Sequence, residues 1–414
     1  MTSNGDSPAR EAAVARRPPV AGFRRPLWAI LLLQLAAAYL LLGIWFTMTG
    51  ADGWNRSGNA IGVDFIQYYA ASGLALEGDA AGVYDRETLF QAERDVVAAD
   101  PGQWPWSYPP TFLLVVLPLA KLPYMASLGL WLASSLALLL FVGYRIWPHP
   151  ITPVLVLLYP AVGNSIFSGQ NGCLSAALLG AGLMLVRRRP WLAGILIGLL
   201  SFKPNLGLLI PLALLAGGHW RVFAGAGLTT LAFAGLSLAA FGLAPWQAFV
   251  DNLGFVAEMI ESRRATLENM PTLFSLVYLP SGPLWLAYAL QAAGLVGAAG
   301  FVIWLWRRPA RLEVQAAGLL LALPLTAPYF QFYDLAMLAL AALWLALAAG
   351  EDGWRRGERA GLALLWLAPV LLWVVALWLG VQLWPLLLVA LLVLVARRAR
   401  GDGGRAPPVV ACRS

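Results

Sequence analysis

The sequence contains few charged residues for its length. Asp, Glu, Lys and Arg together make up 12% of the 414 residues, whereas hydrophobic residues make up 60%. A soluble domain usually carries about 25% charged residues. The apolar residues here form blocks of about 20, each long enough to cross a hydrocarbon core about 30 Å thick. The composition therefore excludes a soluble protein and predicts a polytopic membrane protein.

Cysteine and histidine are each present at only two positions. Cys173 lies in an apolar block and Cys412 near the C-terminus, so the sequence holds neither a disulfide framework nor a metal-ligand spacing. His149 and His219 are isolated, which argues against a histidine-based zinc site. We therefore expect no metal and no other cofactor.

The net charge of +7 comes almost entirely from arginine. The arginines form short clusters at the ends of apolar blocks, such as Arg187–Arg189 and Arg397–Arg398, rather than one continuous surface. This pattern is typical of residues that fix membrane orientation and contact anionic lipid, and it excludes a nucleic-acid-binding surface.

The alternation of apolar blocks and arginines predicts an all-α protein with about twelve transmembrane helices in the cytoplasmic membrane. Residues 26–398 would form one transmembrane domain. Residues 1–25 and 399–414 would be cytoplasmic tails, the first of them disordered. Two loops, 49–108 and 244–280, are expected outside the cell.

Two stretches leave the crossing pattern open. Residues 109–147 could cross once with a kink or re-entrant piece, or twice; a double crossing would place Arg187–Arg189 outside, so we favour the single one. The apolar arms on either side of Lys203 are both short. Lys203 is therefore expected below the outer surface, within a cavity.

The first external loop is acidic, and its sequence indicates two short amphipathic helices. Phe65, Tyr69, Ser72 and Leu76 recur at helical spacing, and residues 89–99 indicate a second helix along the membrane surface. Asp64 stands at the start of the first helix. With Gln67 three residues later, it can be a helix-capping box or a catalytic base facing a cavity. The two roles are compatible.

Five polar clusters fall on the predicted outer side, where an active site would therefore lie. They are Asp64 with Gln67, Tyr108-Pro109-Pro110, Gly169-Gln170-Asn171, Lys203-Pro204-Asn205, and Tyr329 to Asp334. Each has a structural alternative. Lys203 can reach the interface, Gln170 and Asn171 can cap a turn, Asp334 can cap a helix from Leu335, and Tyr108-Pro109-Pro110 suits a helix start.

These motifs, in this order and spacing, resemble the family 87 glycosyltransferases. The stretches are DFIQYY (64–69) with Tyr84-Asp85, YPP (108–110), GQN (169–171), KPN (203–205) and APYFQFYD (327–334), within about residues 26–345. The resemblance implies a GT-C-type membrane enzyme of the kind that includes polyprenyl-phosphate-mannose-dependent mannosyltransferases. It also implies a polyprenyl-phosphate sugar donor, an external active site and an aspartate base in the first external loop.

Sugar transfer from a lipid phosphate needs a base for the acceptor hydroxyl and a cation or hydrogen-bond donors for the departing phosphate. We expect Asp64 to be the base, and Lys203, Gln170 and Asn171 to bind the donor phosphate without a metal. A single direct displacement would invert the anomeric configuration. The residues expected to line the substrate cavity are Gln67, Tyr68, Tyr108, Asn205, Tyr329 and Asp334.

The sequence leaves the sugar and the acceptor open: the sugar would be a hexose such as mannose, and the acceptor a glycolipid or another glycan, with a polysaccharide or a protein also open. A secondary transporter or lipid flippase would also have about twelve spans, but it should carry carboxylates near the bilayer midplane and polar residues on both sides. A structural or assembly protein would leave the outer polar clusters without a purpose.

Overall fold

The computed structural model describes residues 27–51, 54–56, 58–97 and 104–402, and this part of the chain is mostly helical. Two short strands are present within these ranges, and they form an antiparallel hairpin after the first helix. The expected all-α class is thus confirmed apart from this hairpin. The predicted tail of residues 1–25 lies outside the described residues. The elements are α1 (Leu27–Met48), β1 (Gly50–Ala51) and β2 (Trp54–Asn55).

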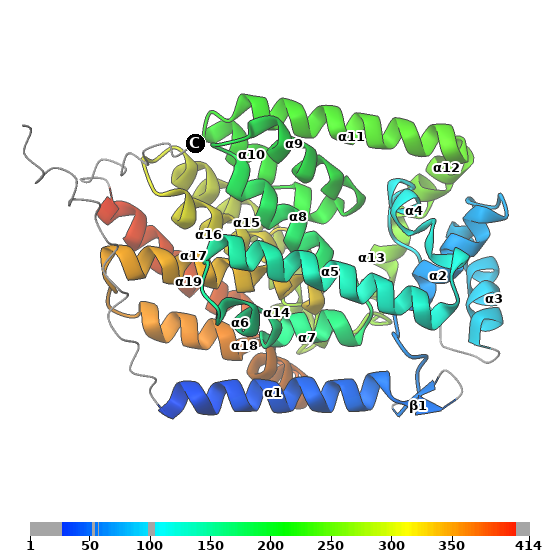
Figure 1. Cartoon of the computed structure of the whole chain (residues 1–414), viewed down its shortest axis with the longest axis horizontal. Helices are drawn as coiled ribbons and strands as arrows, with labels where there is room; N and C mark the ends of the chain where they lie inside the picture. The colour runs from blue at the N-terminus through cyan, green and yellow to red at the C-terminus, as the bar shows by residue number, and fades with distance from the viewer. Residues whose placement is uncertain (1–26, 52–53, 57, 98–103, 403–414) are drawn as a thin grey trace, which may run out of the picture.

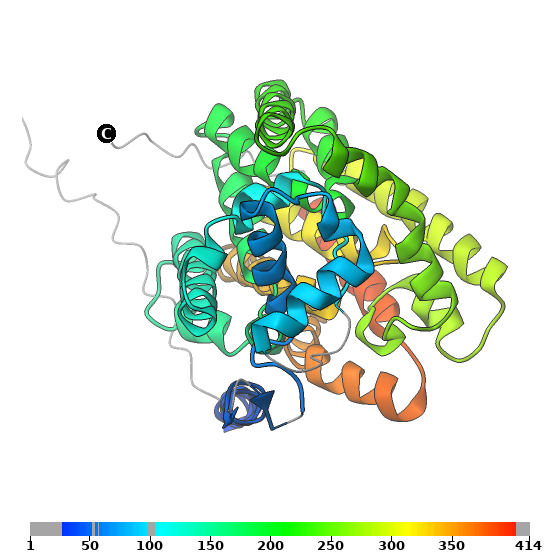
Figure 2. The ribbon, with the colours of Figure 1, turned by 90° about the vertical axis from the view of Figure 1, so that its right-hand side faces the viewer.

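The predicted first external loop is folded into short helices at one end of the molecule, as Figure 2 shows with α2 and α3 in front. Both expected helices of this loop are present, although the second begins at Arg86 rather than at residue 89. Their expected position along the membrane surface stays a prediction. The elements are α2 (Phe65–Leu76), η2 (Gly82–Tyr84), α3 (Arg86–Val97), α4 (Thr111–Val116) and η3 (Leu119–Lys121).

Residues 109–147 pass once between the two ends of the molecule. α4 and η3 stay at the end that holds α2, while α5 runs along the length of the molecule toward α6 (Figure 1). Pro123 directly precedes α5 and ends the preceding short helical segment. The geometry agrees with the single crossing expected from the arginines.

Five helices of the described residues are long and apolar enough to cross a membrane. This supports a membrane protein, with fewer long spans than the twelve expected. The five are α5 (Tyr124–Ile146), α11 (Trp220–Phe241), α15 (Leu284–Trp306), η8 (Phe332–Met337) continued by α17 (Leu338–Asp352), and α18 (Glu358–Leu379).

Most of the other predicted spans are shorter or broken, although α1 has 22 residues and α19 (Trp384–Asp402) has 19. α9, for example, has 10 residues and so rises about 15 Å, half of a hydrocarbon core. Proline near the first turn starts many of these helices because its fixed φ suits that position. They are α6 (Thr152–Leu157), α7 (Pro160–Phe167), α8 (Gly172–Leu185), α9 (Pro190–Leu199), η4 (Leu200–Phe202), η5 (Pro204–Gly207), α10 (Ile210–Ala216), α16 (Leu312–Ala322) and η7 (Leu323–Leu325).

The second predicted external loop is also helical, and it packs against the first. Asn252 Nδ2 donates to the Trp106 carbonyl at 3.3 Å, and the Arg86 guanidinium lies 3.7 Å from the Phe255 ring centroid. The two loops therefore form one layer over that end of the molecule. Its elements are α12 (Ala244–Asp251), α13 (Leu253–Glu261), η6 (Leu267–Asn269) and α14 (Leu273–Tyr278).

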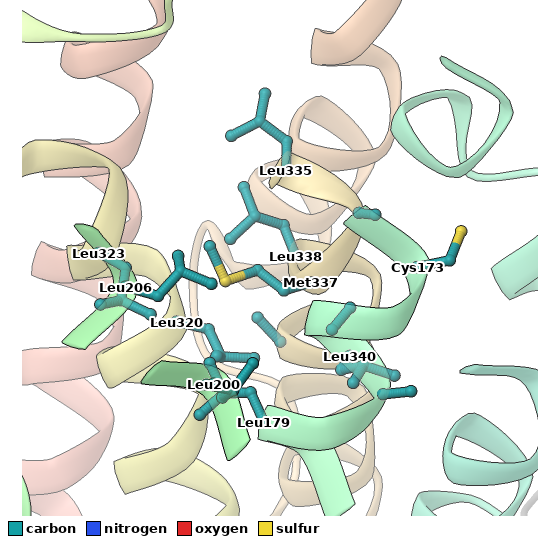
Figure 3. Packing of buried hydrophobic residues seen from close by; sticks show 14 of the residues in the cluster. Cys173, Leu179, Leu200, Leu206, Leu320, Leu323, Leu335, Met337, Leu338 and Leu340 are labelled. Atoms are coloured by element: carbon teal, nitrogen blue, oxygen red, sulfur yellow. The ribbon is translucent and has the colours of Figure 1, made fainter. Parts of the chain in front are cut away.

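The apolar core lies between α8, α16 and α17, where leucines meet Leu200 and Leu206 (Figure 3). The η8–α17 span is 78% buried inside the protein, whereas the span of α11 is 17% buried. α17 is therefore a central helix, and α11 exposes most of its apolar surface to lipid.

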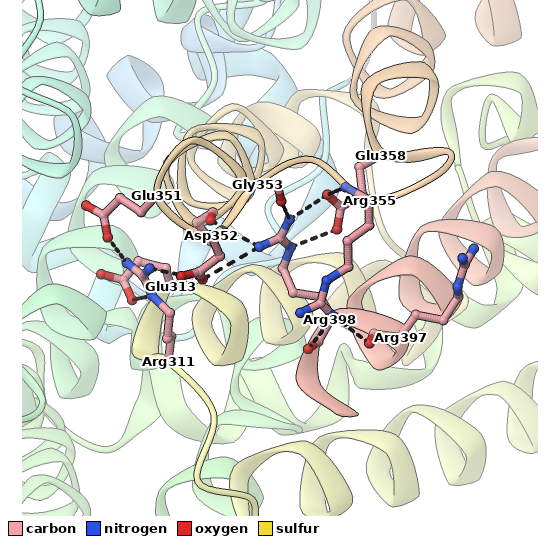
Figure 4. A network of polar contacts seen from close by, with 10 residues as sticks. Arg311, Glu313, Glu351, Asp352, Gly353, Arg355, Glu358, Arg397 and Arg398 are labelled. Atoms are coloured by element: carbon pink, nitrogen blue, oxygen red, sulfur yellow. Dashed lines mark hydrogen bonds and ion pairs between the residues drawn. The ribbon is translucent and has the colours of Figure 1, made fainter. Parts of the chain in front are cut away.

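The end opposite α2 carries a network of arginines and carboxylates (Figure 4). Arg398 is buried and donates to both carboxylate oxygens of Glu358, at 2.7 and 2.6 Å, while Arg311 pairs with Glu351 and Asp352. The expectation that the arginine clusters face anionic lipid is thus wrong for Arg398, which joins α18 to α19 (Trp384–Asp402). α19 also continues beyond residue 398, where the sequence suggested a tail.

Candidate active site

Asp64 lies at an unusual turn that holds it against another segment of the chain. Val63 has a φ of +35°, rare for a β-branched residue, and Gly62 also has a positive φ. The Asp64 backbone N–H donates to the Ser168 carbonyl at 2.9 Å. Strained backbone of this kind persists only where the surroundings enforce it, and it is common at functional sites.

The Asp64 carboxylate does not cap α2, so the expected capping box with Gln67 is wrong. The carboxylate instead accepts a hydrogen bond of 2.9 Å from Gln170 Nε2. Gln170 belongs to the turn between α7 and α8, and Asp64 to the segment before α2. The side chain for which the sequence offered a local cap as an alternative thus makes a contact across more than one hundred residues of chain.

Gln170 is buried, and tyrosine hydroxyls surround its amide oxygen. Gln170 Oε1 accepts from the Tyr68 hydroxyl and, at 3.1 Å, from the Tyr108 hydroxyl. The two hydroxyl oxygens are themselves 2.9 Å apart. These contacts bring together Asp64, Gln170, Tyr68 and Tyr108, which the sequence had assigned to three separate polar clusters.

A second buried group adjoins Gln170. Lys203 Nζ donates to Asn171 Oδ1 at 2.7 Å and forms an ion pair with Asp334. The side chains of Lys203 and Asp334 are 6% and 2% exposed, so this pair is buried rather than interfacial. The anionic partner that a lysine in an apolar block requires is thus supplied by the protein itself.

Asp334 also has the capping role considered from the sequence, but for a helix that begins earlier. Its carboxylate accepts from the Gln331 backbone N–H at 3.4 Å, and this reciprocal box caps η8, which begins at Phe332 rather than Leu335. Pro110 likewise directly precedes α4, as expected for a structural Tyr108-Pro109-Pro110 motif.

Two glycines allow these segments to meet. Gly169 has a φ of +70°, and a Cβ there would lie 2.6 Å from the Gly62 carbonyl oxygen. At Gly172, a Cβ would lie 2.2 Å from the Tyr333 carbonyl oxygen. The first contact sets the approach of Asp64 to Gln170, and the second sets the approach of Asn171 to the Lys203–Asp334 pair.

The remaining expected residues lie at the edge of this group. Asn205 Nδ2 donates to the Tyr329 carbonyl at 3.3 Å. Gln67 is buried on α2, and none of the hydrogen bonds described above involves it. The structure therefore brings Asn205 and Tyr329 into contact with each other, while the link of Gln67 to the site is proximity along α2.

Sequence reasoning missed two aromatic residues that support the site. Trp131 Nε1 donates to the Gly169 carbonyl at 3.0 Å, and the rings of Trp131 and Trp106 pack around Tyr68. Both tryptophans lie in apolar or interfacial stretches where tryptophan is common, so nothing in the sequence distinguishes them.

The surroundings of Asp64 make its carboxyl a weaker acid than an ordinary aspartic acid. Burial raises the pKa of its carboxyl from the ordinary 3.8 to about 7, although the hydrogen bond from Gln170 acts in the opposite direction. A carboxylate with a pKa near the working pH is suited to accept a proton in a reaction. Burial also raises the pKa of Tyr68 well above its ordinary value, so its hydroxyl remains a donor.

The described residues hold no group of three or more His, Cys, Asp or Glu side chains that could ligate a metal ion. The expectation of metal-independent chemistry stays a prediction.

Comparison with known proteins identifies the family. The model of glycosyltransferase family 87 matches residues 106–328, more than half of the chain. The matched region contains Tyr108, Gln170, Asn171 and Lys203, whereas Asp64 precedes it. No curated protein and no solved structure matches the chain. With its long apolar helices, the chain therefore belongs to glycosyltransferase family 87 and is a membrane glycosyltransferase.

Proposed function

We propose that this protein transfers a hexose, mannose being the first to test, from a polyprenyl phosphate to an acceptor hydroxyl with Asp64 as general base. The observation that carries the proposal is the environment of Asp64: a partly exposed carboxylate with a pKa of about 7, held by a hydrogen bond from Gln170. The next residue, Asn171, contacts the buried Lys203 ammonium. A structural carboxylate would instead be fully paired and ionised.

The proposed reaction is a single displacement at the anomeric carbon. The acceptor oxygen forms a bond to this carbon as its proton moves to Asp64, and the bond from carbon to the phosphate oxygen breaks. The electron pair of that bond stays with the polyprenyl phosphate, which leaves with one more negative charge. The product would have inverted anomeric configuration, and no metal is required for this balance.

Asn171 and Lys203 are the proposed contacts of the departing phosphate. Within the described part of the chain, Asn171 Nδ2 is buried without a hydrogen-bond partner, at a cost of about 1–3 kcal/mol that a phosphate oxygen would remove. The Lys203 ammonium has three donors, and two of them are used by Asn171 and Asp334. The third can reach a developing phosphate charge while Asp334 keeps the ammonium in position.

The other expected cavity residues keep proposed roles. We assign Asn205, Tyr329 and Gln67 to the sugar or acceptor side, and Tyr68, Tyr108 and Asp334 to the walls that hold the reacting groups. The acceptor would be a glycolipid or another glycan, and the polyprenyl chain would stay in the lipid beside exposed apolar helices such as α11.

The proposed orientation has this site on the outer face of the cytoplasmic membrane, with both termini inside. It is supported by the acid-rich helices at one end of the molecule and the arginine-rich network at the other (Figures 1 and 4).

The test is transfer by the purified full-length protein from a panel of radiolabelled polyprenyl-phosphate hexoses, with a membrane lipid extract as the acceptor source. We expect one donor to be consumed, a glycolipid product of inverted configuration, and no transfer by Asp64→Asn. Absence of donor consumption, together with solute uptake or lipid translocation in proteoliposomes, would favour a transporter or flippase and refute the proposal.

A further inference from the structure

The side chain of Gln170 links the proposed base to the tyrosine pair by hydrogen bonds. Its Nε2 donates to Asp64 Oδ2, and its Oε1 accepts from the hydroxyls of Tyr68 and Tyr108. An amide oxygen has two lone pairs and each hydroxyl has one proton, so the two hydroxyls can donate to Gln170 Oε1 together only while neither donates to the other across their 2.9 Å contact.

The tyrosines decide which way the amide of Gln170 faces. Each hydroxyl carries one proton, and both groups stay protonated because burial raises the pKa of Tyr68 and Tyr108. In the reversed orientation, Gln170 Oε1 would face Asp64 Oδ2 and repel its charge. The observed orientation therefore depends on Tyr68 and Tyr108, and it presents an N–H to the carboxylate.

The surroundings leave Gln170 little freedom to adopt another arrangement. The side chain is 4% exposed, the Gly169 carbonyl before it accepts from Trp131 Nε1, and the Asn171 backbone N–H after it points at Gln170 Oε1 at 3.4 Å. A long, buried amide fixed at both ends is suited to hold a neighbouring group in place, and less suited to follow a moving substrate.

We propose that Gln170 is a positioning residue for the Asp64 base, and that the Tyr68 and Tyr108 hydroxyls lock its amide in the orientation that favours the ionised carboxylate. Gln170 thus acts through Asp64 rather than as a direct ligand of the donor phosphate. This inference rests on the proposed function, because it assigns Gln170 a role in the proton transfer to Asp64.

The chemistry predicts a specific kinetic signature. A hydrogen bond to the charged form of an acid lowers its pKa, so loss of the Gln170 N–H raises the pKa of Asp64. The pH–rate profile of the wild-type enzyme should rise through about pH 7 as Asp64 ionises. A positioning defect of this kind moves the rising limb, whereas a folding defect lowers the rate equally at every pH.

The experiment measures kcat/KM for sugar transfer against pH, with the purified full-length protein and the polyprenyl-phosphate hexose that the donor panel selects. We expect Gln170→Leu to move the rising limb upward by about one pH unit, with a roughly tenfold lower rate on the acid side and recovery toward the wild-type rate at alkaline pH. Tyr68→Phe combined with Tyr108→Phe should move the limb in the same direction by a smaller amount.

The matched control is Tyr69→Phe. Tyr69 neighbours Tyr68 on α2, but its hydroxyl donates to the Leu122 carbonyl at 2.9 Å, outside the Gln170 group. In Tyr69→Phe, the rising limb of the pH–rate profile should stay at the wild-type pH. An infrared carboxyl band that is present in wild type and absent in Asp64→Asn provides a readout of Asp64 ionisation without catalysis, and it should show the same shift in Gln170→Leu.

The outcomes separate the two proposals. A uniformly lower rate for Gln170→Leu, with the limb and the carboxyl band unmoved, would overturn the positioning role while leaving Asp64 as the base. An unmoved limb in the double tyrosine variant would overturn the locking role of the hydroxyls. Full activity of Asp64→Asn, or a wild-type protein that consumes no donor, would instead refute the proposed function.

Discussion

Replacing Gly169 with alanine should separate Asp64 from Gln170 by a small, calculable distance. The added Cβ would lie 2.6 Å from both the Gly62 carbonyl oxygen and the Phe65 Cβ. Ordinary carbon contacts lie at about 3.5–4.0 Å, so the two segments must move apart by about 1 Å. Because both contacted atoms belong to backbone or to a Cβ, no side-chain rotation can relieve the overlap.

The expected effects of Gly169→Ala follow from this displacement. A left-handed conformation costs alanine about 1–2 kcal/mol, and crowding of this kind costs about 1–3 kcal/mol more. We expect a loss of about 3 kcal/mol in stability. A displacement of about 1 Å between the base and its positioning group should lower the transfer rate by about 100-fold.

Two other glycines separate these contributions. Gly78 has a φ of +92° and open space around it, so Gly78→Ala should cost only the conformational 1–2 kcal/mol and leave the rate unchanged. Gly73 lies inside α2 with open space around it, so Gly73→Ala should stabilise the protein by about 0.5–1 kcal/mol. The assays are thermal unfolding in detergent and the initial rate of sugar transfer. If Gly169→Ala matched Gly78→Ala in both stability and transfer rate, the close approach of Gly169 to Gly62 would not set the geometry of the site.

Three further predictions concern buried charge. Lys203→Met and Asp334→Asn should each cost about 3–5 kcal/mol, and the double variant should cost clearly less than their sum; additive losses in unfolding titrations would argue against the buried ion pair. Because the pKa of Asp64 is raised, its contribution to stability is complete below pH 3.8 and is lost as the pH rises through about 7. The free energy of unfolding of Asp64→Asn should therefore exceed that of wild type by about 2 kcal/mol at about pH 8, after halving the full shift for partial exposure, and by little at about pH 4. An equal difference between variant and wild type at both pH values would contradict the raised pKa. Arg398→Met should destabilise the protein by about 3–5 kcal/mol because it removes two charged hydrogen bonds from the buried Glu358 carboxylate, without changing KM for the donor; an unchanged melting temperature would show that the pair contributes nothing.

The sequence predicted the membrane class, the helices of the first loop and the polar clusters because each has a local signal. Apolar length marks a span, periodicity marks α2 and α3, and a polar residue in an apolar block is conspicuous. Helix breaks within an apolar block have no equally clear signal. α9, α10 and α16, each predicted to be a span or most of one, are therefore too short to cross a bilayer alone.

In the candidate site, too, the sequence identified individual residues but not the contacts between them. Asp64, Gln170, Lys203 and Asp334 could be selected as polar residues in an apolar chain, but their pairing could not. The capping alternative for Asp64 is wrong because its carboxylate binds Gln170, and Lys203 has Asp334 as its anionic partner. Such pairings depend on close approaches between distant backbone segments, which a single sequence does not encode locally.

The most direct measurement of the central claim is the pH dependence of sugar transfer by wild type and Asp64→Asn, with donor and acceptor held constant. We predict a wild-type rate that rises through about pH 7 and then levels off, and a variant that folds and binds donor but transfers no sugar at any pH. A wild-type rate independent of pH between about 5 and 9, with Asp64→Asn equally active, would contradict the assignment of Asp64 as the base.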